Sequence, residues 1–314
     1  MNNIKRFDIA ANCLSKRLSE MFLSLDETDK NRIREIRIRK CRPMTVITGN
    51  GTEFMLASGR LTRIYSSLTV VTDEKEVDEI FRRLCGYSVH SFAHAVNRGY
   101  ITVNGGHRIG VAGTAVTENG RVTAVRDICS LNIRISREIK GAADDVIRKF
   151  YSHGLSSLII AGPPSSGKTT VLRDLARQLS SESYGCKKVF VCDERGEIGA
   201  SFSGVEQNDI GINTDLITSY PKDEGIMIGL RSFSPDIIIC DEVSTYEEAQ
   251  AIVSGVNSGV CFALSIHARN EKELKNKPVF RMLLDTGGFE NILLLSGLYI
   301  GSTEKIFRAG DFCG

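Results

Sequence analysis

The octapeptide Gly-Pro-Pro-Ser-Ser-Gly-Lys-Thr at 162–169 constrains the fold of this chain more than any other feature. It follows the apolar run Leu158–Ile160 and leads into a segment whose apolar residues recur at helical spacing. A strand, a loop and a helix start in this order point successive backbone N–H groups at one phosphate chain. The pattern therefore predicts a P-loop, and its context disfavours the alternative of an ordinary glycine-rich turn.

Each residue type in this loop suits a nucleoside triphosphate. Gly162 and Gly167 allow the required backbone angles and a close approach to the ligand, and Lys168 supplies a positive charge to the β- and γ-phosphates. Thr169 offers its hydroxyl to Mg²⁺. We predict that the nucleotide contacts the whole loop: Gly162, Pro163, Pro164, Ser165, Ser166, Gly167, Lys168, Thr169 and Thr170.

Length and composition indicate a globular protein with room for two domains. The chain has 314 residues, of which 42% are hydrophobic and 25% charged. The longest apolar stretch, 289–300, is too short to cross a bilayer and contains polar residues, and the first residues lack the apolar core of a signal peptide. We therefore expect a cytoplasmic protein whose membrane association, if any, is peripheral or through a partner.

The cysteines and histidines give no sign of a structural metal site. The nine cysteines are scattered without a Cys-x-x-Cys pair, which is typical of reduced thiols, and Cys192, Cys240 and Cys261 lie in apolar runs as small core residues. His90 and His94 have the helical spacing of metal ligands. Because no cysteine or carboxylate lies nearby to complete a site, we interpret them as structural.

Charge divides the chain into two parts. Residues 1–140 hold 23 Lys and Arg against 15 Asp and Glu, a net charge of +8, whereas residues 141–314 hold 17 against 23, a net charge of −6. Two segments of opposite sign suggest two domains, which could attract one another across a subunit contact. The net charge of the whole chain, +2, argues weakly against a nucleic-acid partner.

The first part of the chain has the pattern of an α+β domain. After a helix-like start, Ile33–Arg39 alternates apolar and charged residues as a half-exposed strand does; its arginines could alternatively contact nucleic acid. We predict a helix at Lys75–Leu84. The further predicted strands are a hairpin of Thr45–Ile47 with Glu53–Leu56, a meander of Tyr100–Val103, Arg108–Ala112 and Val122–Val125, and then Leu131–Ile135.

From Ala142 onward the pattern changes to helices alternating with short buried strands, which indicates parallel βαβ units. We therefore predict an α/β fold with a smaller α+β domain at 1–138 and a P-loop domain with a mostly parallel sheet at 139–314.

Polar residues follow three of the apolar strands of the second domain. Asp193–Glu197 follow Val189–Cys192, Asp241 and Glu242 follow Ile237–Cys240, and His267 follows Cys261–Ile266. The carboxyl ends of parallel strands form the edge where ligands bind, so these groups and the P-loop should converge on one crevice.

ATP hydrolysis needs a Mg²⁺ ion on the β- and γ-phosphates and a positioned water. Asp241 fits the carboxylate that holds Mg²⁺ through water, and Glu242 fits the group that orients and deprotonates the attacking water. The alternative for Glu242 is a surface acid at the start of a loop. His267 could sense the γ-phosphate or bond the catalytic acid, and is otherwise a hydrogen-bonded core histidine.

The order of these motifs resembles the secretion ATPase superfamily of type II and type IV secretion systems. The matching segments are the P-loop, the acidic strand end at 193–197, Arg231 to Asp236 before Asp241, and the strand that ends at His267. Within the superfamily the chain is similar to the stage III sporulation AA family of endospore-forming bacteria. That similarity rests on 99–110, 131–138, 193–198, 220–225 and 231–235, and on Asp241 where secretion ATPases usually carry Gly.

The resemblance implies a RecA-like, Mg²⁺-dependent ATPase that assembles with copies of itself as a ring, with the hexamer as the expected form. It further implies a membrane-embedded complex between mother cell and forespore as the partner. Catalytic roles carry over to Lys168, Glu194, Glu197, Glu242 and His267, and the metal set is Thr169, Asp241 and Asp193. Arg134 and Arg231 are the candidates for arginines that reach phosphates across a subunit border.

Two departures from the superfamily pattern leave open how the motor is coupled to transport: Ser265 stands where Thr is common, and the four-cysteine zinc insert is missing. Two other functions stay open on the sequence. One is a nucleotide-regulated scaffold that barely hydrolyses ATP, which Asp241 and Glu242 argue against. The other is a nucleic-acid translocase that uses the basic first domain.

Overall fold

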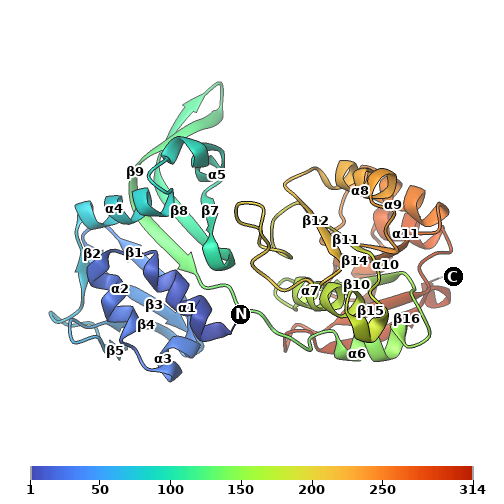
Figure 1. Ribbon diagram of the computed structural model, residues 1–314, viewed down its shortest axis with the longest axis horizontal. Coiled ribbons are helices and arrows are strands. Elements are labelled where there is room, and N and C mark those ends of the chain that lie inside the picture. Colours follow the sequence, from blue (N-terminus) through green and yellow to red (C-terminus); the bar gives the residue numbers. More distant parts are fainter. Residues whose placement is uncertain (1, 313–314) are drawn as a thin grey trace. The chain divides into compact units, whose positions relative to one another are not determined.

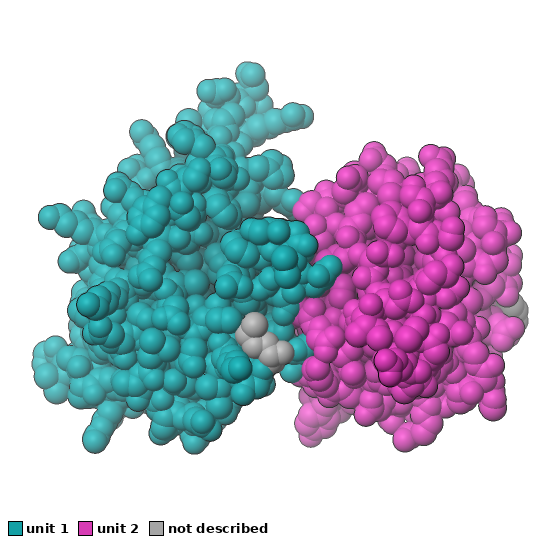
Figure 2. All heavy atoms as spheres, in the orientation of Figure 1, with its two compact units in different colours: residues 1–138, 200–207 teal, residues 139–199, 208–314 magenta. Residues whose placement is uncertain are grey.

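The computed structural model describes residues 2–312, which form two compact units. Within the described residues, unit 1 comprises 2–138 and 200–207, and unit 2 comprises 139–199 and 208–312 (Figure 2). The segment 200–207, which the sequence analysis assigns to the second domain, thus belongs to unit 1. Among the described residues, no helix has the length and apolar character to cross a bilayer.

Unit 1 is built on an antiparallel sheet of seven strands (Figure 1). In spatial order these are β5 (Leu61–Thr62), β4 (Gly51–Met55), β3 (Thr45–Thr48), β1 (Ile33–Arg39), β9 (Arg121–Arg134), β8 (His107–Glu118) and β7 (Tyr100–Val103). A two-stranded ribbon pairs β2 (Arg42–Pro43) with β6 (Val71–Thr72). The helices of the unit are α1 (Asn3–Asn12), α2 (Lys16–Leu23), α3 (Glu27–Arg32), α4 (Glu74–Leu84) and α5 (Ala93–Asn97).

Strand β1 shows how the sequence produces this sheet. Ile33, Ile36 and Ile38 are buried, while the arginines between them reach the surface. A β-bulge between Ile33 and Glu35 adds one residue, so that Ile33 joins the buried face in spite of its odd spacing from Ile36. The alternation predicted for 33–39 is therefore confirmed, with one irregularity that the pattern alone did not reveal.

The β8–β9 hairpin is longer than the sequence predicts. Val122–Val125 and Leu131–Ile135, expected as separate strands, belong to the 14-residue strand β9, apart from Ile135. The turn at Asn119 and Gly120 lies where it was predicted, and both residues have positive φ. The tips of the two strands extend beyond the helices of unit 1 (Figure 1) and their side chains are largely exposed. Because neither face of the hairpin tip is buried, its residues do not alternate between apolar and polar, and the sequence there does not reveal the full length of the strands.

Unit 2 is a mostly parallel sheet with helices on both faces (Figure 1). In spatial order its strands are β12 (Thr214–Thr218), β11 (Val189–Asp193), β13 (Ile237–Cys240), β14 (Cys261–His267), β10 (Leu158–Gly162), β15 (Asn291–Leu295) and the antiparallel β16 (Thr303–Arg308). Its helices are α6 (Asp144–Val146), α7 (Lys168–Leu179), α8 (Lys222–Ser232), α9 (Tyr246–Asn257), α10 (Glu271–Lys275) and α11 (Pro278–Leu284).

The central strands of this sheet are buried on both faces. Alternate residues of β13 pack on opposite sides, Ile237 and Ile239 with α7 and Ile238 and Cys240 with α8 and α9. This is why the strands read as continuous apolar runs. Of the three cysteines predicted in the core, Cys192 and Cys240 are buried and Cys261 is partly buried.

A buried polar cluster holds the segment 200–207 within unit 1. Arg6, which is fully buried, donates to the carbonyl oxygens of Gly105 (3.3 Å) and Gln207 (2.9 Å), and it pairs with Glu138 at 3.4 Å. The Gln207 side chain accepts from the Gly105 N–H at 2.7 Å. His107 is also fully buried, and its Nδ1 accepts from the Ser136 N–H at 3.1 Å. Burial, with a smaller contribution from the Arg6 charge, lowers the pKa of His107 to about 4.

We predict that His107 makes the stability of the chain fall as the pH drops below 6.5. Its folded-state pKa lies below the ordinary value of 6.5, so the unfolded state takes up the proton first. Above pH 6.5 the neutral imidazole makes its full contribution to the free energy of unfolding. At pH 5 that free energy is lower by about 2 kcal/mol. The measurement is the urea midpoint of the full chain at pH 7 and pH 5, for the wild type and for His107→Gln. The variant should be less stable at pH 7 but lose less between the two pH values, and equal losses would contradict the assignment.

Candidate functional site

The P-loop joins the end of β10 to the start of α7, as the sequence predicts. Gly167 precedes the first helical residue in a left-handed conformation with φ 95°, which glycine adopts without strain. Lys168 donates from Nζ to the carbonyl oxygens of Gly162 and Pro163, both at 2.9 Å. Burial lowers the pKa of Lys168, whereas the charges of Asp241 and Glu242 act to raise it. The lysine thus folds back over its own loop and faces the two predicted acids.

Asp241 is held by hydroxyl groups from two other elements. Thr169 Oγ1, in the first turn of α7, donates to Asp241 Oδ2, and Ser265 Oγ, in β14, donates to Asp241 Oδ1. The same Ser265 Oγ accepts from the Glu242 N–H at 2.9 Å. The structure therefore brings Lys168, Thr169 and Asp241 together as predicted, and it adds Ser265, which the sequence analysis had noted only as a departure from a pattern.

Glu242 is held at three points in a turn that side chains rarely adopt. Its φ is 52°, in the left-handed region, where a residue with a Cβ is strained. Ser265 bonds its N–H, and Lys222 Nζ donates to its carbonyl oxygen at 2.9 Å. Its carboxylate forms an ion pair with Arg195, which lies in the loop after β11. Ser265 and Lys222 thus hold the backbone of Glu242, while Arg195 pairs with its carboxylate.

Lys222 is a buried cation at the centre of these segments, and the sequence analysis missed it. Besides the Glu242 carbonyl oxygen, its Nζ contacts Glu248 Oε1 at 2.9 Å and Glu194 Oε2 at 3.6 Å. Burial acts to lower the pKa of Lys222, but the surrounding groups outweigh it and raise the pKa. The only sequence signal was its position in 220–225, one of the segments that carry the family resemblance.

Glu248 completes this arrangement from the start of α9. Its Oε2 accepts from the N–H groups of Ser244 (2.6 Å) and Thr245 (2.9 Å), and the Thr245 hydroxyl caps the helix in return. Burial acts to raise the pKa of Glu248, but these N–H groups and Lys222 outweigh it and lower the pKa. A capping box that also binds a buried lysine fixes the chain just after Glu242.

Asp193 organises the loop that follows β11. Its Oδ1 accepts from the Glu197 N–H (2.8 Å), and its Oδ2 accepts from the N–H groups of Ile198 (3.0 Å) and Gly199 (2.9 Å). Burial raises the pKa of Asp193, against the effect of these three bonds. Arg173 of α7 bonds the carbonyl oxygens of Glu197 and Ile198 at 2.5 and 2.8 Å. The metal role of Asp193 and the catalytic role of Glu197 stay predictions.

The predicted histidine and arginines lie in different places. His267 ends β14, in register with Gly162 at the start of the P-loop. Arg231 is in the last turn of α8, nine residues and about 13 Å along the helix from Lys222. Arg134 lies in unit 1, where it pairs with Glu35 at 3.6 Å. Of the three, only His267 is beside the P-loop by strand pairing, and the role of the arginines across a subunit border stays a prediction.

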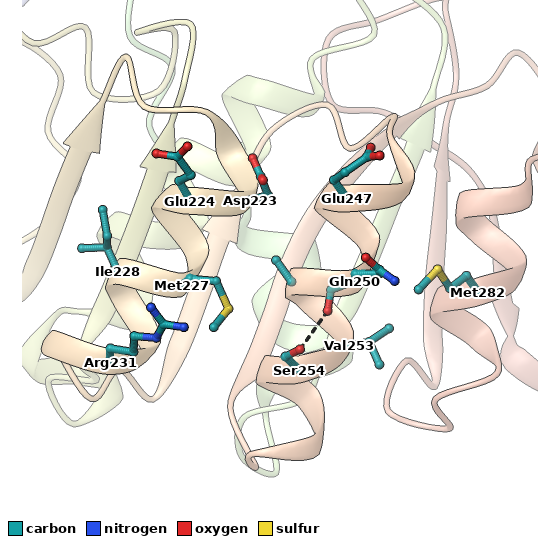
Figure 3. A pocket seen from close by; sticks show the side chains of 11 residues that line it. Asp223, Glu224, Met227, Ile228, Arg231, Glu247, Gln250, Val253, Ser254 and Met282 are labelled. Carbon is teal, nitrogen blue, oxygen red and sulfur yellow. Dashed lines mark hydrogen bonds between the residues drawn. The ribbon is translucent and has the colours of Figure 1, made fainter.

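Arg231 lines a groove of about 830 Å³ between α8 and α9. Figure 3 shows Met227 and Ile228 of α8 on one side, Gln250 and Val253 of α9 on the other, and Met282 of α11 beyond α9. Glu224 and Glu247 stand at one end of the two helices and Arg231 toward the other (Figure 3). The lining residues do not include Lys168, Asp241 or Glu242, although the groove begins at the first turns of α8 and α9, next to Lys222 and Glu248.

The donor set at the P-loop fits a phosphate chain with Mg²⁺. A hydroxyl at Thr169 and a carboxylate at Asp241 are oxygen ligands of the kind that Mg²⁺ takes alongside substrate phosphates. Ser166 Oγ, in the same loop, is buried and lacks a hydrogen-bond partner within the described residues. Among residues 2–312 no three His, Cys, Asp or Glu side chains group as a metal site.

Comparisons with known proteins agree with this architecture. The family described as "Sporulation stage III, protein AA" matches residues 4–305. Stage III sporulation protein AA of Bacillus subtilis (strain 168) is 33% identical over 288 residues, which cover 91% of this chain and 90% of the relative.

Two solved structures share the fold. The ATPase DotB of Legionella pneumophila has a TM-score of 0.53 at 16% identity, over 85% of this chain and 73% of that chain. The pilus retraction motor PilT, solved with bound ADP, has a TM-score of 0.53 at 14% identity, over 83% of this chain and 74% of that chain. These likenesses confirm the predicted fold class, a RecA-like α/β domain preceded by an α+β domain.

We predict that Lys222→Met destabilises the chain by about 3 kcal/mol, because it leaves the buried Glu248 carboxylate without its cation. The matched control is Lys188→Met, which removes a lysine that is half exposed and 3.8 Å from Asp236; it should cost less than about 1 kcal/mol. Urea unfolding of the full chain measures both. A loss in Lys222→Met no larger than in the control would show that the buried contacts contribute little.

Proposed function

The chain belongs to the sporulation stage III protein AA family, and on this premise we propose that it is a Mg²⁺-dependent ATPase of the secretion-motor class. The observation that carries the proposal is the contact of Asp241 with Thr169, the residue that follows the P-loop lysine. Asp241 ends β13, which is separated from the P-loop strand β10 by β14, and its carboxylate is bonded to the Thr169 hydroxyl. In P-loop enzymes that transfer a phosphoryl group to water, a carboxylate and a hydroxyl in these positions hold the Mg²⁺ ion.

The residues divide the work of hydrolysis between them. The P-loop N–H groups and Lys168 would bind the β- and γ-phosphates, with Lys168 exchanging its bonds to Gly162 and Pro163 for phosphate oxygens. Thr169 and Asp241 would hold Mg²⁺, which supplies neutralising charge on those phosphates when it is bound. Glu242 would accept the proton of the attacking water, and Lys222 and Ser265 keep its backbone in place.

The ion pair between Arg195 and Glu242 supports a second candidate. While Arg195 holds the carboxylate, the Glu242 oxygens are engaged in the ion pair and are less available to an attacking water. A chain that keeps this pair with nucleotide bound would act as a nucleotide-regulated scaffold with little hydrolysis. Both groups are partly exposed, however, so the pair is weak and can open, and we favour the ATPase.

We further propose that the protein works as a ring, with six copies as the arrangement that the family resemblance suggests, on the cytoplasmic side of a membrane-embedded complex between mother cell and forespore. What supports the ring is the opposite charge of the two parts of the chain, +8 and −6, which favours contact between unlike domains of neighbouring copies. Arg134 and Arg231 are the candidates for reaching a neighbour's nucleotide. Nucleic acid is not an expected partner.

We predict that Lys168→Ala abolishes both nucleotide binding and turnover, whereas Glu242→Gln retains binding and loses turnover by a factor of about 10² to 10⁴. The reason is that Lys168 would contact the phosphates of bound ATP before hydrolysis, whereas Glu242 would act only on the attacking water. Binding of MgATP by calorimetry and steady-state phosphate release measure the two effects. Glu247→Gln, an exposed acid on α9, is the matched control and should keep both. Normal turnover in Glu242→Gln would remove this residue as the base.

We also predict that phosphate release per chain rises with protein concentration, because neighbours complete the site in a ring. The measurement is specific activity over a range of chain concentrations, together with the solution mass with and without an ATP analogue and Mg²⁺. Activity per chain that stays constant while the mass stays that of a monomer would exclude the ring and leave a single-chain nucleotide switch.

A further inference from the structure

The loop between β15 and β16 exposes three large apolar side chains in a row. Leu298 is 83% exposed, Tyr299 77% and Ile300 59%. The loop is nevertheless closed at its base, where the Ser296 N–H donates to the Ser302 carbonyl oxygen at 2.8 Å and the Ser302 N–H donates to the Tyr299 carbonyl oxygen at 3.2 Å. A loop closed in this way that presents three adjacent apolar side chains to solvent is a candidate binding surface.

This loop is attached directly to the P-loop. The Gly301 N–H donates to the Ser166 carbonyl oxygen at 2.7 Å. Ile300 lies so close to Gly167 that a Cβ on the glycine would be 2.7 Å from Ile300 Cγ2, and a Cβ on Gly297 would be 3.2 Å from Pro163. Strand β15 pairs in parallel with the P-loop strand β10, so both loops leave the same edge of the sheet. The apolar side chains are therefore held beside the site proposed for the phosphates.

We propose that Leu298, Tyr299 and Ile300 form the platform on which the base of the bound nucleoside triphosphate stacks. The proposal rests on the proposed function, since the phosphates at the P-loop are what bring the base to the loop. Residues 296–302 carry no charged side chain, which suits an uncharged aromatic ring and not a phosphate or an acidic peptide. Because stacking uses the face of a base and tolerates any base, the platform accepts nucleotides as a class and discriminates weakly between adenine and guanine.

The test uses a chain that has no tryptophan. Tyr299→Trp places a single indole on the platform, and its fluorescence should change on addition of MgATP but not of magnesium tripolyphosphate, which has no base. Tyr87→Trp, at a similarly exposed tyrosine in unit 1, is the control and should respond to neither. A Tyr299→Trp signal that is equal for both ligands, or absent at saturating MgATP, would overturn the platform.

Calorimetry on the full chain supplies the second arm. Tyr299→Ala should weaken MgATP binding by about tenfold and leave tripolyphosphate binding unchanged, and Tyr299→Phe should restore MgATP binding, because the ring and not the hydroxyl makes the stack. Equal weakening of both ligands would mean that the loop only supports the P-loop, and unchanged MgATP affinity would mean that the base lies elsewhere. Loss of self-association in Tyr299→Ala with unchanged MgATP affinity would assign the patch to a second copy of the chain. Each of these results contradicts the platform.

The two proposals fail in different ways. One outcome is that the wild type binds tripolyphosphate and MgATP equally tightly, while Lys168→Ala binds neither. This result would keep the P-loop site and reject the platform. Wild-type chain that binds neither ligand would reject the proposed function and the platform with it.

Discussion

The contact of Asp241 with Thr169 and Ser265 is the interaction on which the candidate site depends. It joins the end of β13, the first turn of α7 and strand β14 through one carboxylate. The parallel sheet explains why this is possible: β13 and β14 are neighbours, and β14 lies between β13 and the P-loop strand. Side chains that are far apart in the sequence thus reach one edge because their strands run in the same direction. Glu242 is one residue further and takes its position from this contact.

The site is also where the structure departs from local preference. Ser165 and Glu242 have positive φ, and Lys222 and Asp193 are charged groups that are largely removed from water. Each of these features costs stability unless its surroundings compensate it. For the two charged groups the compensation is specific: three backbone N–H groups bond Asp193, and Glu248 and the Glu242 carbonyl oxygen bond Lys222. The stability that permits this comes from the apolar layers on the two faces of the sheet, which leave the edge free for polar groups.

The sequence was sufficient to predict the central strands and the P-loop, because continuous apolar runs and a glycine-rich loop are local signals. The edge strand β12 and the hairpin of β15 with β16 were not predicted, since half-buried edges carry weak periodicity and 289–300 read as one apolar stretch. Arg195 and Lys222 were missed for another reason. Their partners lie 47 and 20 to 28 residues away, and no pattern of single residues reveals a contact that only the folded sheet creates.

The segment 200–207 shows the same limit at the scale of domains. The pattern of predicted helices and strands assigns residues 200–207 to the second domain. In the structure, however, Arg6 and Gly105 bond Gln207 inside unit 1. The residues just before it, 197–199, are the ones whose N–H groups Asp193 binds. Residues 200–206 connect Gly199, which is bonded to Asp193, with Gln207, which is bonded to Arg6 in unit 1. The loop that carries Glu194 and Arg195 is therefore continuous in the chain with a segment that packs in unit 1, a connection that no local pattern in the sequence reveals.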